Sequence, residues 1–118
     1  MHVGAWWDTG HKMVCNLAYE LLTPVAAAAV DSMIKEHGSL GRACLWADFI
    51  KGERKDTRSW HYINLPDDEQ NTFKATCPDN GCIIDAFYKQ LVILQNKKKL
   101  LQERQEALWF VGHFVGDI

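Results

Sequence analysis

The sequence predicts an all-α fold, and three observations support this prediction. Apolar residues recur at helical spacing in several separate segments of the 118-residue chain. Residues that start or stop helices stand at the borders of these segments, as at Thr23-Pro24 and Gly38. No two segments alternate as the strands of a β-hairpin do, and the sequence has no internal repeat. We therefore expect a multi-helix domain of ordinary size.

The first third of the chain predicts two helices. The first helix is predicted by one apolar face, which is formed by Met13, Val14, Leu17, Ala18, Leu21 and Leu22. Thr23 is a good N-cap and Pro24 a good first helical residue, so a second helix is expected from Val25 to about His37. Gly38 is its expected stop.

The middle of the chain predicts one more helix and then irregular structure. Leu40 to Lys51 carries apolar residues on one side and is expected to be helical. Lys51 to Ser59 is charged and is interpreted as a surface loop. Trp60 to Pro66 alternates and ends in proline, which predicts an extended segment. Asp67 to Cys82 is polar and contains turn residues, so we expect a loop.

The last third predicts two helices, from Ile83 to about Lys97 and from about Leu100 to the end. The only basic run, Lys97-Lys98-Lys99, stands between them. Lysines at a helix end are favourable to the helix dipole, so we interpret the run as a solvated helix end.

Composition excludes several classes of protein. The chain is 47% apolar and 24% charged, which argues against disorder. No apolar run reaches the roughly 18–20 residues that a membrane span needs. The formal net charge is -2, whereas a purely electrostatic nucleic-acid binder would be more basic.

The first five residues are too short and too polar to be a secretion signal. Two interpretations stay open. The residues are the remnant of a signal that is cleaved after Ala5, which would make Trp6 the amino terminus. Alternatively, they are an initiator Met followed by a cloning scar.

Four cysteines give two different predictions. Cys77 and Cys82 enclose four residues, three of them strong turn formers, so a short disulfide and an oxidising compartment are one interpretation. A zinc knuckle is the alternative, although no second cysteine pair or nearby His completes it. Cys15 and Cys44 lie in apolar helical contexts and are predicted to be small buried thiols.

Five polar residues are unexpected in a plain helical core. His113 and Asp117 are one helical turn apart in apolar surroundings. Singly, each of the five has an ordinary explanation, such as a surface carboxylate or a hydrogen-bonded core histidine. Together, Asp48, His61, His113 and Asp117 would make a closed N/O set for one zinc ion, and Asp117 could bridge to a second ion bound by His11. Two zinc ions roughly 3.5–4 Å apart can activate one water between them.

The segment Trp6-Trp7-Asp8-Thr9-Gly10-His11 resembles the opening motif of the S-one/P-one nuclease family. Four further motifs stand in family order: Leu22-Thr23-Pro24, Trp46-Ala47-Asp48, Trp60-His61-Tyr62-Ile63-Asn64, and the segment from Glu106 to Asp117. The resemblance covers almost the whole chain from Trp6. It implies the mostly helical fold that these nucleases share with the zinc phospholipases C.

The resemblance also implies a metal centre, since complete family members carry three zinc ions. Asp48, His61, His113 and Asp117 match the ligands of the first ion. The second ion is held in the family by the residues that match Asp117 and His11, and by the α-amino nitrogen and carbonyl oxygen of the amino-terminal Trp, matched here by Trp6. At most two of the three sites are partly represented here. The Cys77–Cys82 loop matches a short disulfide of the family.

The activity implied by the resemblance is hydrolysis of the P–O3′ bond in single-stranded DNA or RNA, and of 3′-phosphomonoesters, by a metal-activated water. The products carry 5′-phosphates. Asp48 and Lys51 are the expected catalytic residues, and Lys51 takes the place of an Arg that contacts phosphate. Tyr62 and Asn64 match residues that stack on a base and bind its edge. Such a protein would be secreted or periplasmic.

The chain ends at Ile118, before the segments in which the family has its third-ion ligands and later helices. We therefore expect residues 6–118 to be the amino-terminal part of a single zinc nuclease domain, with its carboxy-terminal helices missing and little activity alone. Exposed apolar helix faces would favour self-association. The alternatives are a phospholipase C-like hydrolase, against which Tyr62 and Asn64 argue, and a non-catalytic helical fragment that binds zinc or self-associates.

Overall fold

The computed structural model of the chain describes residues 2–3, 8–64, 77–79 and 81–118. Its elements in chain order are β1 (His2–Val3), α1 (Asp8–Glu20), α2 (Pro24–Met33), α3 (Leu40–Ala43), α4 (Trp46–Ile50), the 3-10 helix η1 (Lys55–His61), β2 (Ile63–Asn64), α5 (Ile83–Gln95) and α6 (Leu101–Asp117). The predicted all-α class is confirmed. One detail differs, because β1 and β2 form a two-residue antiparallel ladder that pairs Val3 with Ile63.

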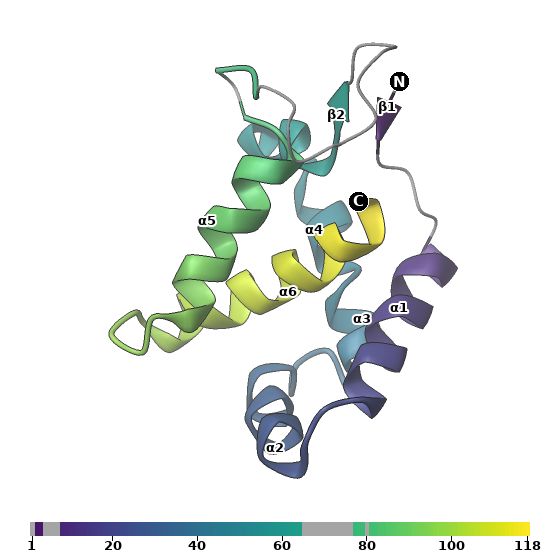
Figure 1. The fold of residues 1–118 in the computed structure, drawn as a ribbon, viewed down its shortest axis with the longest axis vertical. Coiled ribbons are helices and arrows are strands. Elements are labelled where there is room, and N and C mark those ends of the chain that lie inside the picture. The colour runs from purple at the N-terminus through teal and green to yellow at the C-terminus, as the bar shows by residue number, and fades with distance from the viewer. Residues whose placement is uncertain (1, 4–7, 65–76, 80) are drawn as a thin grey trace.

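Helix α6 lies in the middle of the molecule, with α5 on one side and α1 on the other (Figure 1). Its buried side chains enter two different apolar clusters. Phe110 and Phe114 pack with Ile63 and Ile83 in one cluster. Trp109 packs in the other, which contains Cys15, Ile34, Leu40, Ala43 and Cys44. The last turns of α6 therefore lie at the border between the two clusters.

The predicted start of α2 is confirmed, whereas its predicted end near His37 is wrong. The Thr23 hydroxyl accepts a hydrogen bond from the Ala26 amide at 3.2 Å, so it caps α2 as expected. The helix ends at Met33, earlier than predicted. Gly38 follows with a φ of 82°, a conformation that favours glycine, and its amide donates to the Ile34 carbonyl at 3.1 Å.

The single helix predicted from Leu40 to Lys51 is wrong, because the chain breaks it into α3 and α4. At the break, the Leu45 amide donates to the Arg42 carbonyl and the Asp48 amide donates to the Leu45 carbonyl, each at 3.1 Å. In an unbroken α-helix the Asp48 amide would donate to the Cys44 carbonyl. The break therefore leaves the Cys44 carbonyl available to another donor.

Both cysteine pairs are disulfides in the structure. Cys77–Cys82 agrees with the turn and with the family resemblance. The prediction of free thiols at Cys15 and Cys44 is wrong, since these residues are buried but bonded to each other across 29 residues of sequence. Such a pairing is non-local, so the apolar context of each cysteine gave no sign of it.

The charged segment predicted as a loop contains η1, which begins at Lys55 and ends at His61. The Thr57 hydroxyl donates to the Arg54 carbonyl at 2.7 Å, and Thr57 is fully buried. The predicted extended segment is therefore shorter than expected and is limited to β2. The predicted loop at 67–82 lies mostly outside the described residues.

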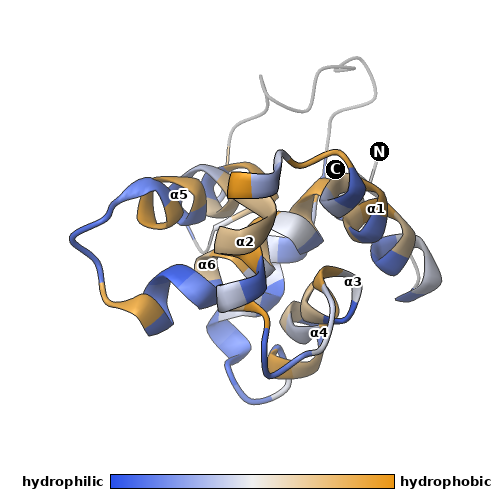
Figure 2. Cartoon of the chain, turned by 90° about the horizontal axis from the view of Figure 1, so that it is seen from below, coloured by the Kyte–Doolittle hydropathy of each residue, from blue (hydrophilic) through white to orange (hydrophobic). Residues whose placement is uncertain are grey.

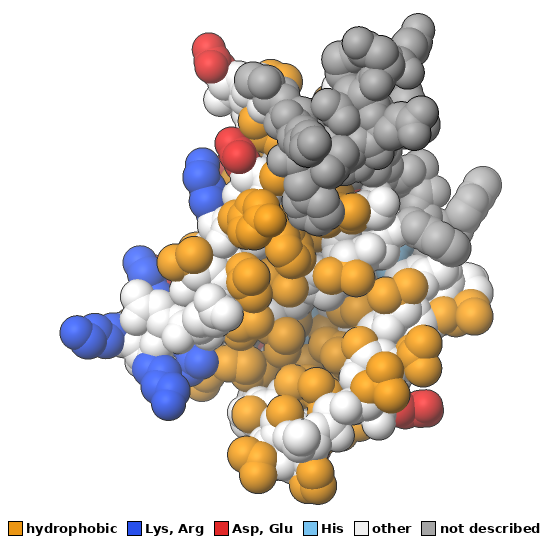
Figure 3. Space-filling model, viewed as in Figure 1, with side chains coloured by type: hydrophobic (Ala, Val, Ile, Leu, Met, Phe, Trp, Pro, Cys, Tyr) orange, Lys and Arg blue, Asp and Glu red, His pale blue; other side chains and the backbone are white. Residues whose placement is uncertain are grey.

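The helices carry both hydrophilic and hydrophobic residues, drawn in blue and orange in Figure 2. Apolar side chains remain exposed, however, along α1 and the start of α2, where Met13, Leu17, Leu21 and Val25 are 66%, 59%, 78% and 82% exposed. On the face seen in Figure 3, hydrophobic side chains gather over a broad area, and Lys and Arg gather near the α5–α6 turn. In the described part of the chain, no helix is long and apolar enough to cross a membrane. Self-association through the exposed apolar face stays a prediction.

Candidate metal centre

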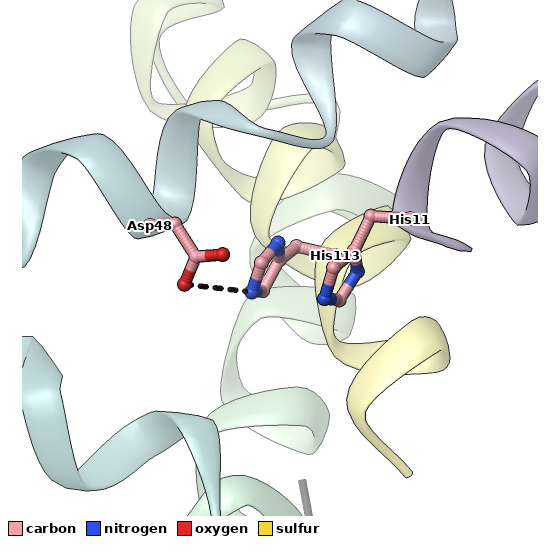
Figure 4. A group of neighbouring side chains, drawn as sticks. All are labelled: His11, Asp48 and His113. Atoms are coloured by element: carbon pink, nitrogen blue, oxygen red, sulfur yellow. Dashed lines mark ion pairs between the residues drawn. The ribbon is translucent and has the colours of Figure 1, made fainter. Parts of the chain in front are cut away.

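Four separate elements bring the five predicted polar residues together. His113 and Asp117 come from α6, Asp48 from α4, His61 from the end of η1, and His11 from the first turn of α1. Figure 4 shows how His11, Asp48 and His113 converge from three of these elements. Four of the five residues are almost fully buried, whereas the side chain of Asp48 is 27% exposed. The interior of the site is therefore closed, and Asp48 forms its edge.

In a group of four potential donor atoms, each of the two imidazole nitrogens lies 3.0–3.4 Å from the other three atoms. The four atoms are Asp48 Oδ1, His61 Nδ1, His113 Nε2 and Asp117 Oδ2. His61 Nδ1 lies 3.1 Å from His113 Nε2 and 3.4 Å from each of the two carboxylate oxygens. His113 Nε2 lies 3.4 Å from Asp48 Oδ1 and 3.0 Å from Asp117 Oδ2. Bonds of about 2.0–2.1 Å to one ion place tetrahedral ligands about 3.3 Å apart, so the set fits an ion without rearrangement.

The second oxygen of Asp117 faces the other way. Asp117 Oδ1 lies 3.1 Å from His11 Nε2, and the His11 ring stacks on the His113 ring with centroids 3.9 Å apart. Asp117 can thus hold one ion with His113 and a second with His11. The position of Asp117 is compatible with the bridging role expected from the sequence, which stays a prediction.

Not all of these close atoms have a hydrogen bond. Among the described residues, His11 Nε2 and Asp117 Oδ2 have no partner with hydrogen-bond geometry, and both atoms are buried. Buried polar atoms almost always have a partner, and leaving one without is costly. A cation bound between these atoms would accept their lone pairs and so replace the missing hydrogen bonds. The residues present therefore fit a metal centre.

The orientation of His113 is fixed by the helix break at Cys44. His113 Nδ1 lies 2.6 Å from the Cys44 carbonyl oxygen. A carbonyl only accepts, so Nδ1 carries the hydrogen and donates it. The lone pair of the neutral ring is then on Nε2, which faces the carboxylates. A backbone carbonyl that orients a metal-binding His in this way is a common feature of metal sites.

The charges of the site favour a cation. Burial raises the pKa of Asp48, but hydrogen bonds to His113 and Lys51 outweigh it and lower the pKa to about 2. Burial likewise raises the pKa of Asp117, and contacts with His11, His113 and His61 hold it well below its usual range. Burial lowers the pKa of His113, but Asp117 and Asp48 raise it to about 9. Both carboxylates are therefore ionised at neutral pH. When no metal is bound, a protonated His113 supplies the positive charge beside them.

Two glycines of α6 allow α1 and Cys44 to approach it closely. A Cβ at Gly116 would lie 2.5 Å from His11 Nδ1. A Cβ at Gly112 would clash with Cys44 Sγ and lie 3.1 Å from Cys15 Sγ. The Cys15–Cys44 disulfide thus packs directly against the turn of α6 that carries His113.

An open pocket of about 610 Å³ adjoins the site. Asp48, His61, Lys51 and Tyr62 line it, together with Phe49, Gly52 and Arg58. Lys51 Nζ lies 3.1 Å from Asp48 Oδ1, so the predicted phosphate-contacting cation is beside a predicted metal ligand. Arg58 was not singled out in the sequence, because it stood in a segment expected to be a loop; its spacing of three residues before His61 was the available signal.

Asn64 and Trp6 are not among the described residues that line the pocket. Asn64 is exposed on β2, opposite His2 in the ladder. Trp6 is outside the described residues, so its predicted role stays a prediction.

Comparisons with known proteins agree with the motifs. Residues 6–118 match the family model described as S1/P1 Nuclease. The chain belongs to this family. It is 33% identical over 129 residues to Endonuclease 2 of Arabidopsis thaliana, covering 99% of the chain and 44% of that protein. It is 31% identical to Endonuclease 1 of the same plant, covering 98% of the chain and 43% of that protein. Nuclease P1 of Penicillium citrinum is 26% identical, with coverage of 96% and 45%.

The predicted membership of the S1/P1 nuclease family is thereby confirmed. This S1/P1 nuclease chain spans less than half the length of the curated relatives it matches.

Proposed function

We propose that the protein acts in the zinc-dependent hydrolysis of phosphodiester bonds in single-stranded DNA or RNA. The observation that carries the proposal is the pair His61 Nδ1 and His113 Nε2, each 3.0–3.4 Å from the other and from Asp48 Oδ1 and Asp117 Oδ2, where Asp117 Oδ2 is buried without a hydrogen bond to a described residue. Family membership supplies the class of reaction. The donor set supplies the choice of metal, since two imidazoles and two carboxylates in a tetrahedron suit zinc.

The metal and the chain have separate roles in this proposal. When bound, zinc would supply Lewis acidity toward a phosphoryl oxygen and toward the attacking water. Asp48 is the only partly exposed member of the site and lines the pocket, so we assign it the orientation of that water. Lys51, next to Asp48, holds a phosphate oxygen as a point charge, without the bidentate fork of an Arg.

Base binding is assigned to the strand that follows His61. Tyr62 and Asn64 are exposed, while Ile63 between them is buried, so the two side chains share one face of the chain. Tyr62 lines the pocket beside Asp48. Stacking of a base on an aromatic ring is worth about 1–3 kcal/mol and tolerates any base. This suits a nuclease of low sequence specificity, which would also act on 3′-phosphomonoesters and leave 5′-phosphorylated products.

The second zinc ion would use Asp117 Oδ1, His11 Nε2 and the amino terminus of Trp6. An α-amino nitrogen is a metal ligand only when it is free, whereas the nitrogen of a peptide bond is a poor one. The proposal therefore expects two bound zinc ions in a chain that begins at Trp6, and one in the chain that begins at Met1.

Two disulfides within a small domain are typical of an oxidising compartment. We infer that the protein is secreted or periplasmic.

Zinc content and cleavage test the proposal together. The protein is dialysed against zinc, freed of excess metal and analysed by mass spectrometry, and cleavage of an end-labelled single strand is compared with that of a duplex. Both are measured for chains beginning at Met1 and at Trp6. We expect Asp48→Asn to lower zinc affinity by about 100-fold or more, since even the loss of a group that only orients a metal ligand costs about 10–100-fold. Asp85→Asn, an exposed carboxylate on α5, is the matched control. Absence of both retained zinc and zinc-dependent cleavage would overturn the proposal.

A further inference from the structure

Arg58 is a cation of the pocket to which the function proposed above gives no role. It stands three residues before His61 in η1, and side chains at this spacing eclipse each other along a 3-10 helix. Lys51 stands three residues after Asp48, at the end of α4. Each of the two short elements therefore presents one donor of the metal centre and one cation to the same pocket.

The guanidinium of Arg58 is anchored at one end. Its Nε donates a hydrogen bond to the Lys51 carbonyl at 3.2 Å. This bond fixes the plane of the group and leaves its two terminal nitrogens to act as donors. An anchored fork loses less conformational freedom on binding an anion than a mobile lysine does.

The charge of Arg58 has no acidic partner among the residues that the structure describes. Lys51 pairs with Asp48, and Arg54 pairs with Glu106 at 2.7 Å. In the described ranges, no carboxylate lies within ion-pair distance of Arg58. Of the two cations that line the described pocket, Lys51 pairs with Asp48, whereas Arg58 contacts a backbone carbonyl.

We propose that Arg58 binds a phosphate of a single strand, next to the phosphate held at Lys51 and the metal centre. The proposal rests on the function proposed above for the identity of the ligand. Lys51 Nζ reaches Asp48, whereas the Arg58 guanidinium lies at the backbone end of the same lysine. The two cations therefore contact different groups, the Asp48 carboxylate and the Lys51 backbone carbonyl, and each can bind its own phosphate of a strand. Arg58 is a positioning residue, since it contacts a phosphate that does not react.

The test measures binding instead of cleavage. Fluorescence anisotropy gives the Kd of a short phosphorothioate oligothymidylate, which resists hydrolysis, over a range of salt concentrations. Arg58→Gln should raise the Kd about tenfold, the loss of one charge-assisted hydrogen-bonded contact. It should also reduce the slope of log affinity against log salt by about 0.7, the value for one phosphate contact on a single strand. Arg58→Lys, which keeps the charge without the fork, should have a Kd between those of the wild type and Arg58→Gln.

Arg104→Gln is the matched control. Arg104 Nε also donates to a backbone carbonyl, that of Leu94 at 3.1 Å, but Arg104 does not line the pocket. Equal urea midpoints for the two variants show that both are folded. Thymidine 3′-phosphorothioate, with one phosphate group, should bind to wild type and Arg58→Gln within twofold.

Three results would overturn the inference. They are an Arg58→Gln Kd and salt slope equal to those of Arg104→Gln, an equal loss of affinity for the ligand with one phosphate, or no binding of the oligonucleotide by the wild type. The measurements are repeated after EDTA treatment, because the Arg58 contact does not pass through the metal. A protein that binds no zinc but still depends on Arg58 contradicts the proposed function alone.

Discussion

The two sides of α6 hold the candidate metal centre in different ways. Toward α4, η1 and α5, Asp48 and His61 are positioned by an apolar cluster built around Phe110 and Phe114. Toward α1, His11 is positioned by close backbone approach at Gly116, and the Cys15–Cys44 disulfide ties α1 to the turn before α4.

This difference separates the two halves of the site. On the α4 side, His61 Nδ1 and His113 Nε2 are each 3.0–3.4 Å from the other and from Asp48 Oδ1 and Asp117 Oδ2. On the α1 side, the described residues supply only His11 Nε2 and Asp117 Oδ1. Packing thus completes the first half, whereas the second half depends on a covalent tie and on two glycines. Asp117 belongs to both.

Removal of Asp117 should break both halves and give the largest effect. Asp117→Asn removes the negative charge shared by the two ions, so the affinity for every zinc equivalent should fall by about 100-fold or more. His11→Asn should spare the four-atom set and weaken only the second ion. Isothermal titration with zinc measures both affinities. Equal effects of the two substitutions would contradict the division of the site into two halves.

The disulfides give the next largest contrast. Cys15–Cys44 closes 29 residues and Cys77–Cys82 closes 5. Loop entropy then predicts that the pair Cys15→Ala and Cys44→Ala costs about 3.5 kcal/mol of unfolding free energy, against about 2 kcal/mol for the pair Cys77→Ala and Cys82→Ala. Urea unfolding measures both.

The first disulfide should also affect zinc binding, because it packs on Gly112 beside His113. We expect weaker zinc binding without Cys15–Cys44 and unchanged binding without Cys77–Cys82. The opposite order would show that the α1 side does not need its covalent tie.

The same contrast explains what the sequence could predict. Residues that act locally were found, such as the Thr23 cap and the one-turn spacing of His113 and Asp117. Their chemistry depends only on neighbours in the chain. The five donors were recognised by residue type and by family motifs, and the structure brings all five together.

Features that depend on distant segments were missed. Cys15 and Cys44 pair across 29 residues, and the break at Cys44 makes sense only once His113, on another helix, donates to that carbonyl. The 3-10 helix was missed because its charged residues resemble a loop, although Thr57 and His61 are buried by tertiary contacts. Arg58 was missed for the same reason.

The pH dependence of the metal-free protein tests the four-atom half. The pKa of His113 is raised from 6.5 to about 9, so its stabilising contribution is complete below pH 6.5 and is lost as the pH rises through 9. The pKa of Asp48 is lowered from 3.8 to about 2, so its contribution is present above pH 3.8 and is lost as the pH falls through 2. The EDTA-treated protein should therefore be most stable between pH 3.8 and pH 6.5, where both contributions are complete.

Zinc binding must displace the His113 proton, so zinc affinity should rise about tenfold per pH unit from 7 to 9. Urea midpoints and zinc titrations that stay flat over this range would contradict the ion pairs.

Gly116→Ala should give the smallest and most selective effect, because the three atoms nearest to its added Cβ all belong to His11. Overpacking of this kind costs about 1–3 kcal/mol, of which the better helix propensity of Ala returns up to about 1 kcal/mol. The remainder should appear as displacement of His11. In a chain that begins at Trp6, the second zinc equivalent should therefore bind about tenfold more weakly, while the first changes by less than about twofold. Gly52→Ala, where a Cβ meets no atom within 4 Å, is the matched control. Equal weakening of both equivalents would mean that α1 supports the four-atom set as well, and that the two sides of α6 are a single packed unit.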